Sequence, residues 1–304
     1  MSAAAMDFTR PAPPSGRALR SYFLISALIC AAICAVILIT LLGQTGPVLS
    51  HNPASLFGTV WNPNLGQYGI IPMLYGSIVV MVIAMAIALP LGVLTAIYIA
   101  ETRSARLRGI IKSALEVLAG IPSIVYGLIG VAYISVWVAK GLDLQTGRLI
   151  LTAGLILAVM ILPTILTLTE DAISNVPVIQ RENARALGLY RHEVILDVVL
   201  PHARRDILAA GLLALGRALG ETMAVMLVIG SLDRLPSPIF NVLSSGQTIT
   251  SKLGRELGES AFGSAHFSAL VLMGLILVLI TLTLTGAAQW LINRRPNGVE
   301  AIYD

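Results

Sequence analysis

Long apolar runs are the feature that most constrains this chain. Residues 21–43 contain no charged side chain, and further runs of the same character recur along the 304 residues. A helix needs about 20 consecutive apolar residues to cross a bilayer. Charged residues make up only 12% of the sequence, whereas soluble domains carry about 25%. Because so little charge cannot cover a soluble globule of this size, the sequence predicts an all-α integral membrane protein.

Six membrane-spanning helices are expected. The first run is longer than the apolar region of about 7–15 residues in a cleaved signal peptide, so we interpret it as a span. The expected organisation is a six-span domain at 21–292, between a disordered basic arm at 1–20 and a tail at 293–304. The predicted spans are 21–43, 72–100, 121–139, 149–169, 207–231 and 267–292.

The distribution of Lys and Arg predicts the orientation of these spans. With the N-terminus inside, 14 of the 20 basic residues fall on the inner side and five on the outer side, while Arg217 lies within the fifth span. Since cytoplasmic loops carry the excess of Lys and Arg, both termini are expected in the cytoplasm. The net charge of +4 is therefore a topology signal and does not indicate nucleic-acid binding.

Catalytic and metal-binding functions find no support in the residue pattern. Cys30 and Cys34 lie inside the first apolar run, and no third Cys or nearby His accompanies them. No nucleophile and base are placed as a membrane enzyme would need. We expect a non-catalytic chain that binds no cofactor or metal.

The segment 109–119 is amphipathic and ends at Gly120-Ile121-Pro122-Ser123. Glycine and proline interrupt helices, so we expect an interfacial helix that is separate from the third span. The alternative is one long kinked span.

The long inner loop at about 170–206 departs most clearly from a plain helical hairpin. It holds eleven charged residues in a chain that is otherwise short of them, which suggests a soluble partner. Gly188 is placed to end one short helix in the left-handed conformation. Pro201 is expected to stop a second one before the fifth span. The alternative is an amphipathic loop that lies on lipid headgroups.

The spacing in this loop resembles a known motif. Glu182-x-Ala184, three residues, Gly188, nine residues and then Val198-x-Leu200-Pro201 is similar to the EAA loop of ABC-importer permeases, with Asn183 and Val198 as departures. The resemblance implies that a separate ATPase subunit docks here. No G-x4-G-K-[ST] motif is present, so ATP and Mg are expected on that partner. The expected docking residues are Glu182, Ala184, Gly188, Leu200 and Pro201.

Two ionisable residues lie inside the fifth span. A charge at the centre of a span costs about 2.5–3.5 kcal/mol on insertion scales, so Arg217 and Glu221 need a reason to be there. Four residues apart on a helix, they share one face and are expected to pair. The planar guanidinium can donate two parallel hydrogen bonds to a tetrahedral oxyanion, which makes Arg217 a candidate anion site. The structural alternative is a buried ion pair that only fixes the packing of the spans.

Three further stretches resemble phosphate ABC-importer permeases of the PstC type. They are GRALGETMAVMLVIG at 216–230, GIPSIVYG at 120–127, and Trp61-Asn62-Pro63 with PMLYGS at 72–77. The family implies import of inorganic phosphate across the bacterial cell (inner) membrane. It also implies four kinds of partner: a PstA-like permease, two PstB-like ATPases, a PstS-like phosphate-binding protein and the lipid bilayer. The expected substrate-path residues are Arg217, Glu221, Thr222 and Ser123.

Two alternatives stay open at this point. An ABC permease for another oxyanion, such as sulfate or molybdate, suits an Arg site equally well. An ion-coupled secondary transporter of an oxyanion could use Arg217 and Glu221 as a proton relay, but it leaves the EAA-like loop unexplained.

Overall fold

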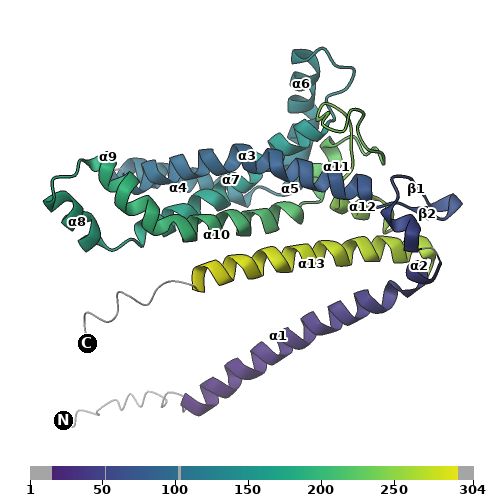
Figure 1. The fold of residues 1–304 in the computed structure, drawn as a ribbon, viewed down its shortest axis with the longest axis horizontal. Helices are drawn as coiled ribbons and strands as arrows, with labels where there is room; N and C mark the ends of the chain where they lie inside the picture. The colour runs from purple at the N-terminus through teal and green to yellow at the C-terminus, as the bar shows by residue number, and fades with distance from the viewer. Residues whose placement is uncertain (1–15, 52, 102–103, 294–304) are drawn as a thin grey trace, which may run out of the picture.

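The computed structural model describes residues 16–51, 53–101 and 104–293, and it is helical almost throughout (Figure 1). Most of the predicted arm at 1–20 and the tail beyond Asn293 lie outside the described residues. The helices and strands are α1 (Gly16–Gln44), α2 (Gly46–His51), η1 (Pro53–Phe57), β1 (Trp61–Asn62), η2 (Pro63–Leu65), β2 (Gln67–Tyr68), α3 (Ile71–Glu101), α4 (Ala105–Gly120), α5 (Ser123–Ile129), η3 (Gly130–Ile134), α6 (Ser135–Gly141), α7 (Ile150–Ser174), α8 (Val178–Ala186), α9 (Arg191–Glu193), η4 (Val194–Val199), α10 (Leu200–Leu219), α11 (Met223–Val228), α12 (Ile249–Glu256) and α13 (Ala265–Asn293).

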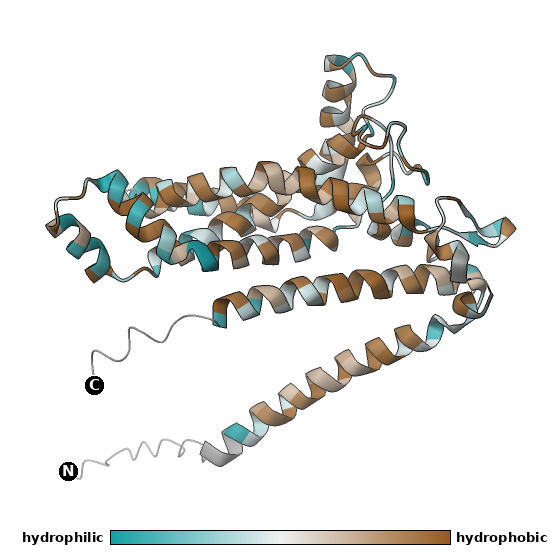
Figure 2. Ribbon diagram, viewed as in Figure 1, coloured by the Kyte–Doolittle hydropathy of each residue, from teal (hydrophilic) through white to brown (hydrophobic). Residues whose placement is uncertain are grey.

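Within the described residues, five helical segments are long and apolar enough to cross a membrane: Arg20–Ser50, Ile71–Glu101, Ser123–Gly141, Ile150–Ser174 and Ala265–Asn293. They correspond to the first four predicted spans and the sixth. Figure 2 shows the apolar residues running along α1, α3 and α13, whereas hydrophilic residues gather on α8. From Arg20 onward the side chains of α1 are almost entirely exposed, as expected for a helix that faces lipid.

The fifth predicted span, 207–231, is not one continuous helix. α10 ends at Leu219, Gly220–Thr222 are not α-helical, and α11 restarts at Met223. α10 is not among the five apolar segments because its 20 residues include Arg204, Arg205, Asp206 and Arg217. The break therefore falls on the residues that the sequence marks as functional.

Pro201 does not stop the second short helix of the inner loop, so that prediction is wrong. The chain is helical without interruption from Arg191 to Leu219 through α9, η4 and α10. η4 is a π-helix, and the Leu200 N–H donates to the Ile195 carbonyl five residues back. A π turn is wider than an α turn, and it accommodates the ring and the missing N–H of proline.

The predicted break before the third span is confirmed. α4 ends at Gly120, and Ile121 and Pro122 take extended backbone angles before α5 begins at Ser123. One long kinked span is excluded. Lys112 on α4 pairs with Glu170 on α7 at 2.7 Å, which ties the interfacial helix to the bundle.

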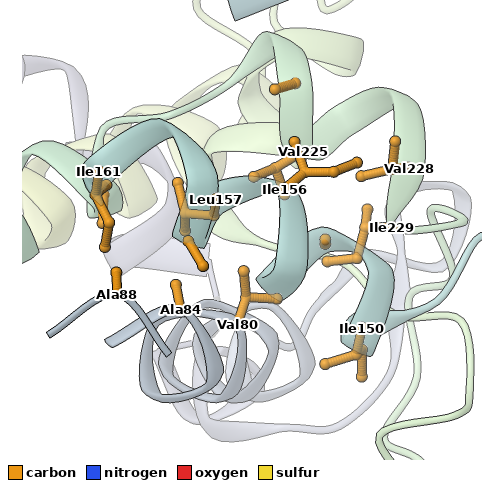
Figure 3. Close-up of a cluster of buried hydrophobic side chains, with 14 of the residues drawn as sticks. Val80, Ala84, Ala88, Ile150, Ile156, Leu157, Ile161, Val225, Val228 and Ile229 are labelled. Carbon is orange, nitrogen blue, oxygen red and sulfur yellow. The ribbon is translucent and has the colours of Figure 1, made fainter. Parts of the chain in front are cut away.

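Small side chains let α3 pack closely on α7. Val80, Ala84 and Ala88 lie four residues apart on α3 and face Leu157 and Ile161 of α7 (Figure 3). Val225, Val228 and Ile229 of the α11 segment complete the same cluster. This core fixes the position of α11 and of the break that precedes it.

The bundle has two distinct ends (Figure 1). One end holds α8 and α9 together with the end of α3. The opposite end holds α2, the β1–β2 hairpin and α12. The segment at about 170–206 and the end of α3, which were predicted to lie on the same side of the membrane, therefore lie at the same end of the molecule.

Candidate functional site

Arg217 lies near the end of α10 and contacts α7. Its Nη1 group donates to the Thr164 hydroxyl at 2.8 Å. At 1.5 Å per residue, Thr164 stands roughly 21 Å from the start of α7 and roughly 15 Å from its end. The guanidinium therefore reaches the middle of a membrane-spanning helix. Thr164 was not among the predicted site residues, because a threonine inside a membrane-spanning helix most often bonds the backbone of its own helix.

Glu221 is not the partner of Arg217 in this structure, contrary to the expectation from helical spacing. α10 has ended by Glu221, whose carboxylate accepts the Ala224 N–H at 3.2 Å and so supports the start of α11. Among the described residues, no ion pair joins Arg217 to Glu221. The break frees the Arg217 guanidinium from the carboxylate that would have neutralised it.

The signature stretches come together around this break. α5 packs on α11 so closely that a Cβ on Gly127 would lie 3.0 Å from the Ala224 Cα atom. From the other side, α12 covers the break, with the Thr250 hydroxyl donating to the Glu221 carbonyl at 2.8 Å. Thr222 sits under the same helix, because a Cβ on Gly254 would meet its methyl carbon at 2.8 Å.

Ser123 and Thr222 remain predictions as substrate-path residues. Ser123 is the first residue of α5 and follows the non-helical Pro122. The Thr222 hydroxyl donates to the Gly220 carbonyl at 3.3 Å, which leaves it at the non-helical turn beside Glu221. Both lie where the backbone interrupts a helix, and such interruptions at membrane depth occur where they line a cavity or are buried in protein.

Gly76 of the PMLYGS stretch is explained by a close backbone approach. A Cβ at this position would lie 2.0 Å from the Gln247 carbonyl oxygen. The adjacent Ser77 hydroxyl accepts the Ile249 N–H at 3.0 Å. These contacts fasten α12 to the start of α3, and they place α12 over the α10–α11 break.

The segment 232–265 folds back on the bundle around a buried lysine. The Lys252 side chain is completely buried and pairs with Asp233, and with Glu256 at 2.5 Å. Its Nζ atom lies 4.9 Å from the centre of the Trp61 ring. Glu256 also accepts from Trp61 Nε1 at 3.1 Å and lies 3.0 Å from His266. Trp61 of the Trp-Asn-Pro stretch therefore contacts this charged cluster, and the sequence spacing gave no indication of these contacts.

Glu256→Gln is expected to lower the thermal midpoint of the purified protein. Burial disfavours the Glu256 carboxylate, but hydrogen bonds and positive charge from Lys252 and His266 lower its pKa below the usual 4.5. A carboxyl group whose pKa is lower in the folded state than in the unfolded state stabilises the protein at pH values above its unfolded-state pKa. This contribution is lost as the pH falls through the folded-state pKa. The stability difference between wild type and variant should be full above about pH 4.5 and shrink in more acidic buffer.

The matched control for this experiment is Glu259→Gln, because Glu259 is an exposed acid three residues along the chain. Melting curves followed by intrinsic fluorescence at a series of pH values supply the measurement. A Glu256→Gln difference that does not change with pH would contradict the assignment.

The α8–α9 segment contains most of the residues of the predicted docking motif. Gly188 has φ +89°, and its N–H donates to the Arg185 carbonyl at 2.9 Å, so it ends α8 as predicted. Glu182 and Pro201 are exposed, and Leu200 is half-buried. Ala184 is only 5% exposed and packs against Val194 and Val199, so it supports the segment from within.

Glu101 anchors this segment to the bundle and was not among the sequence-predicted residues. Its carboxylate accepts from Arg181 of α8 at 2.6 Å and lies 3.5 Å from Arg191 of α9. The Arg191 guanidinium also donates to the Glu101 carbonyl. The last residue of α3 therefore contacts both short helices and joins them to a membrane-spanning helix.

Comparison with known proteins identifies the family. The model described as "Binding-protein-dependent transport system inner membrane component" matches residues 88–297. The chain belongs to this family. Its matched region includes both the α8–α9 segment and the α10–α11 break, and the family model supports a non-catalytic permease subunit embedded in a membrane.

Two curated relatives sharpen the likeness. The phosphate transport system permease protein PstC of Mesorhizobium japonicum is 36% identical over 253 residues, which cover 77% of this chain and 76% of the relative. The PstC of Xylella fastidiosa is 35% identical over 312 residues, covering 92% of this chain and 94% of the relative. The expected resemblance to phosphate ABC-importer permeases is confirmed.

A solved structure shares the fold. A chain in the crystal structure of a bacterial alginate ABC transporter, in complex with its alginate-bound periplasmic protein, aligns with a TM-score of 0.55 at 15% identity. The alignment covers 90% of this chain and 95% of that one. The predicted all-α permease fold of an ABC importer is therefore confirmed, and partners of the ABC kind are implied. Membership in this family disfavours an ion-coupled secondary transporter.

Proposed function

We propose that this chain is the PstC-like permease subunit of an ATP-driven importer that carries inorganic phosphate into the cytoplasm. The observation that carries the proposal is Arg217, an always-charged guanidinium at mid-membrane depth that makes no ion pair with Glu221. Its hydrogen-bond partner is the neutral Thr164 hydroxyl, so a tetrahedral oxyanion can supply the countercharge and accept two parallel hydrogen bonds. The similarity to PstC relatives favours phosphate over sulfate or molybdate.

A second permease subunit of the PstA type completes the path. The Arg217 side chain is exposed in the isolated chain, although it lies at a depth where facing lipid costs about 2.5–3.5 kcal/mol. Another protein surface must therefore cover it in the membrane. We infer that the phosphate path runs between the two permeases, with Arg217, Glu221, Thr222 and Ser123 on this chain's side.

The α8–α9 segment receives the ATPase in this proposal. Two PstB-like subunits bind ATP and Mg, and one of them seats on the surface around Glu182, Gly188 and Pro201. When the two ATPase subunits close on ATP, they pull α8 and α9, and Glu101 transmits this movement to α3. This end of the molecule, where α1 begins and α13 ends, faces the cytoplasm, which agrees with its excess of basic residues. The α12 end then faces a PstS-like binding protein.

The proposed function predicts that phosphate stimulates ATP hydrolysis by the reconstituted complex only when its binding protein is present. The complex would be purified from its native membrane, placed in lipid vesicles and assayed with phosphate, sulfate and molybdate in turn. Stimulation several times larger with phosphate than with either other anion is expected. Equal stimulation by sulfate or molybdate would show that the substrate is not specifically phosphate. A rate of ATP hydrolysis that none of the three anions changes would contradict the proposed importer function.

A further inference from the structure

A large cationic cavity lies between α4 and the α8–α9 segment, well away from Arg217. It measures about 910 Å³. Its charged lining consists of Arg108, Lys112, Arg181, Arg185, Arg191 and Glu101. The α8–α9 segment forms part of the cavity wall, but Arg217 of the proposed phosphate path and the docking residues Glu182, Gly188 and Pro201 do not line it.

Positive charge exceeds negative charge around the cavity. Among the described residues, Glu101 is the only carboxylate in the lining, and it is shared by Arg181 and Arg191. Glu170 pairs with Lys112 from outside, so five cations face two carboxylates, an excess of three. The Glu193 carboxylate accepts the Tyr190 N–H at 2.6 Å. If Glu193 is counted as a third carboxylate, the cations still exceed the carboxylates by two. Such a cavity attracts an anion.

An apolar groove adjoins the cavity. It measures about 640 Å³ and shares Glu101 and Arg191 with the cationic lining. Its other walls are mostly the apolar side chains of Leu94, Ile97, Tyr98, Leu107 and Ile195. On α3, Leu94 and Tyr98 are 65% and 56% exposed and lie one helical turn apart, just before the span ends at Glu101. The groove therefore runs from the apolar part of a span to the charged cavity.

We propose that the cavity and groove together bind an anionic phospholipid such as phosphatidylglycerol. The headgroup phosphate accepts hydrogen bonds in the cationic cavity, and one acyl chain lies along the groove on α3. Basic pockets beside membrane spans on the cytoplasmic side suit anionic headgroups. A free phosphate ion shares the headgroup chemistry but leaves the apolar groove without an occupant.

The position of the site gives the lipid a mechanical role. The lining comes from α4, from the end of α3 and from the α8–α9 segment, three elements that also share one buried apolar cluster through Leu115, Ile99 and Ala184. A bound headgroup bridges them and stabilises one position of α8 and α9 relative to the spans. The inference does not depend on which anion the transporter carries.

The test measures lipid retention by native mass spectrometry of the purified transporter after exchange into mixed phosphatidylglycerol and phosphatidylcholine. Selective retention of phosphatidylglycerol is expected. Because each cation near an anionic headgroup contributes about 1 kcal/mol, Arg185→Gln should weaken it about fivefold. Leu94→Gln, at an exposed position in the groove, should also weaken it. Arg204→Gln is the matched control, since Arg204 is an exposed cation on α10 outside both linings.

Three results would overturn the proposal. The first is equal retention of the two lipids by the wild-type transporter. The second is an equal loss in Arg185→Gln and Arg204→Gln, which would show a diffuse charge effect. The third is displacement of the lipid by inorganic phosphate with no effect of Leu94→Gln, which would assign the cavity to the free ion. The proposed importer would survive each of these results, because it is tested separately by phosphate-stimulated hydrolysis.

Discussion

Arg217→Gln is expected to abolish phosphate uptake while the protein remains in the membrane at its normal level. Hydrogen bonds to charged groups contribute about 1.5–3 kcal/mol each, and the guanidinium fork makes two of them to an oxyanion. Losing both should reduce uptake by a factor of about 100 or more. Uptake of radiolabelled phosphate by whole cells, normalised to the amount of permease on an immunoblot, gives the measurement.

Two companion variants separate charge from geometry at this site. Arg217→Lys keeps the positive charge but loses the planar fork, so it should retain a small part of the uptake. Thr164→Val removes the hydroxyl that holds Arg217 at 2.8 Å and leaves its charge in place, so a weaker defect is expected. Normal uptake by Arg217→Gln would refute the assignment of the anion site. An equal, complete loss in all three variants would point instead to a purely structural role.

Gly188→Val is expected to remove the ATPase from the purified complex. Gly188 holds φ +89°, and no atom lies within 4 Å of where its Cβ would stand, so the cost of the substitution comes from the backbone alone. A β-branched residue cannot adopt this conformation without strain of about 1–3 kcal/mol. The end of α8 should therefore refold, and the exposed surface around Glu182 should lose its shape. Co-purification of the ATPase through a tag on the permease measures the effect.

Gly188→Asn is the matched control for this experiment. Asparagine is the residue that most readily replaces glycine in the left-handed region, so this variant should keep most of the ATPase. Loss of the ATPase from both variants would mean that side-chain bulk at the interface matters, rather than the turn. Full retention by Gly188→Val would contradict the docking assignment.

The two variants should fail at different steps. Arg217→Gln is expected to keep the ATPase bound, since Arg217 lies about 25 Å along α10 from the inner loop. Gly188→Val is expected to leave the mid-membrane site intact but without a source of energy. Measuring uptake and co-purification on both variants therefore tests the substrate site and the coupling site independently.

Predictions that depend on composition and local spacing agree well with the structure. Residues 21–43 and the other apolar runs correspond to helices because only helices satisfy backbone hydrogen bonds inside a bilayer. The end of α8 at Gly188 and the break at Ile121-Pro122 follow from the local conformations of glycine and proline. In each case the deciding interaction lies within a few residues of the position.

Predictions that assumed regular helix failed where long-range contacts altered the backbone. Arg217 and Glu221 were expected on one face, but α10 stops between them, because α11 is held separately by α5, α7 and α12. Pro201 continues a helix because a π turn widens around it. Neither event leaves a signal in the neighbouring residues.

The sequence by itself determined the class of the protein, the approximate positions of its spans and the two stretches that hold its candidate functional residues. Hydrophobicity and the backbone preferences of glycine and proline are local properties, so they can be read residue by residue. Only the tertiary structure decided which side chains meet: Arg217 with Thr164, Glu101 with Arg181 and Arg191, and Lys252 with Asp233, Glu256 and Trp61. These partners lie between four and 191 positions apart along the chain. Their meeting depends on how whole helices pack, because packing is set by the summed contacts of many side chains.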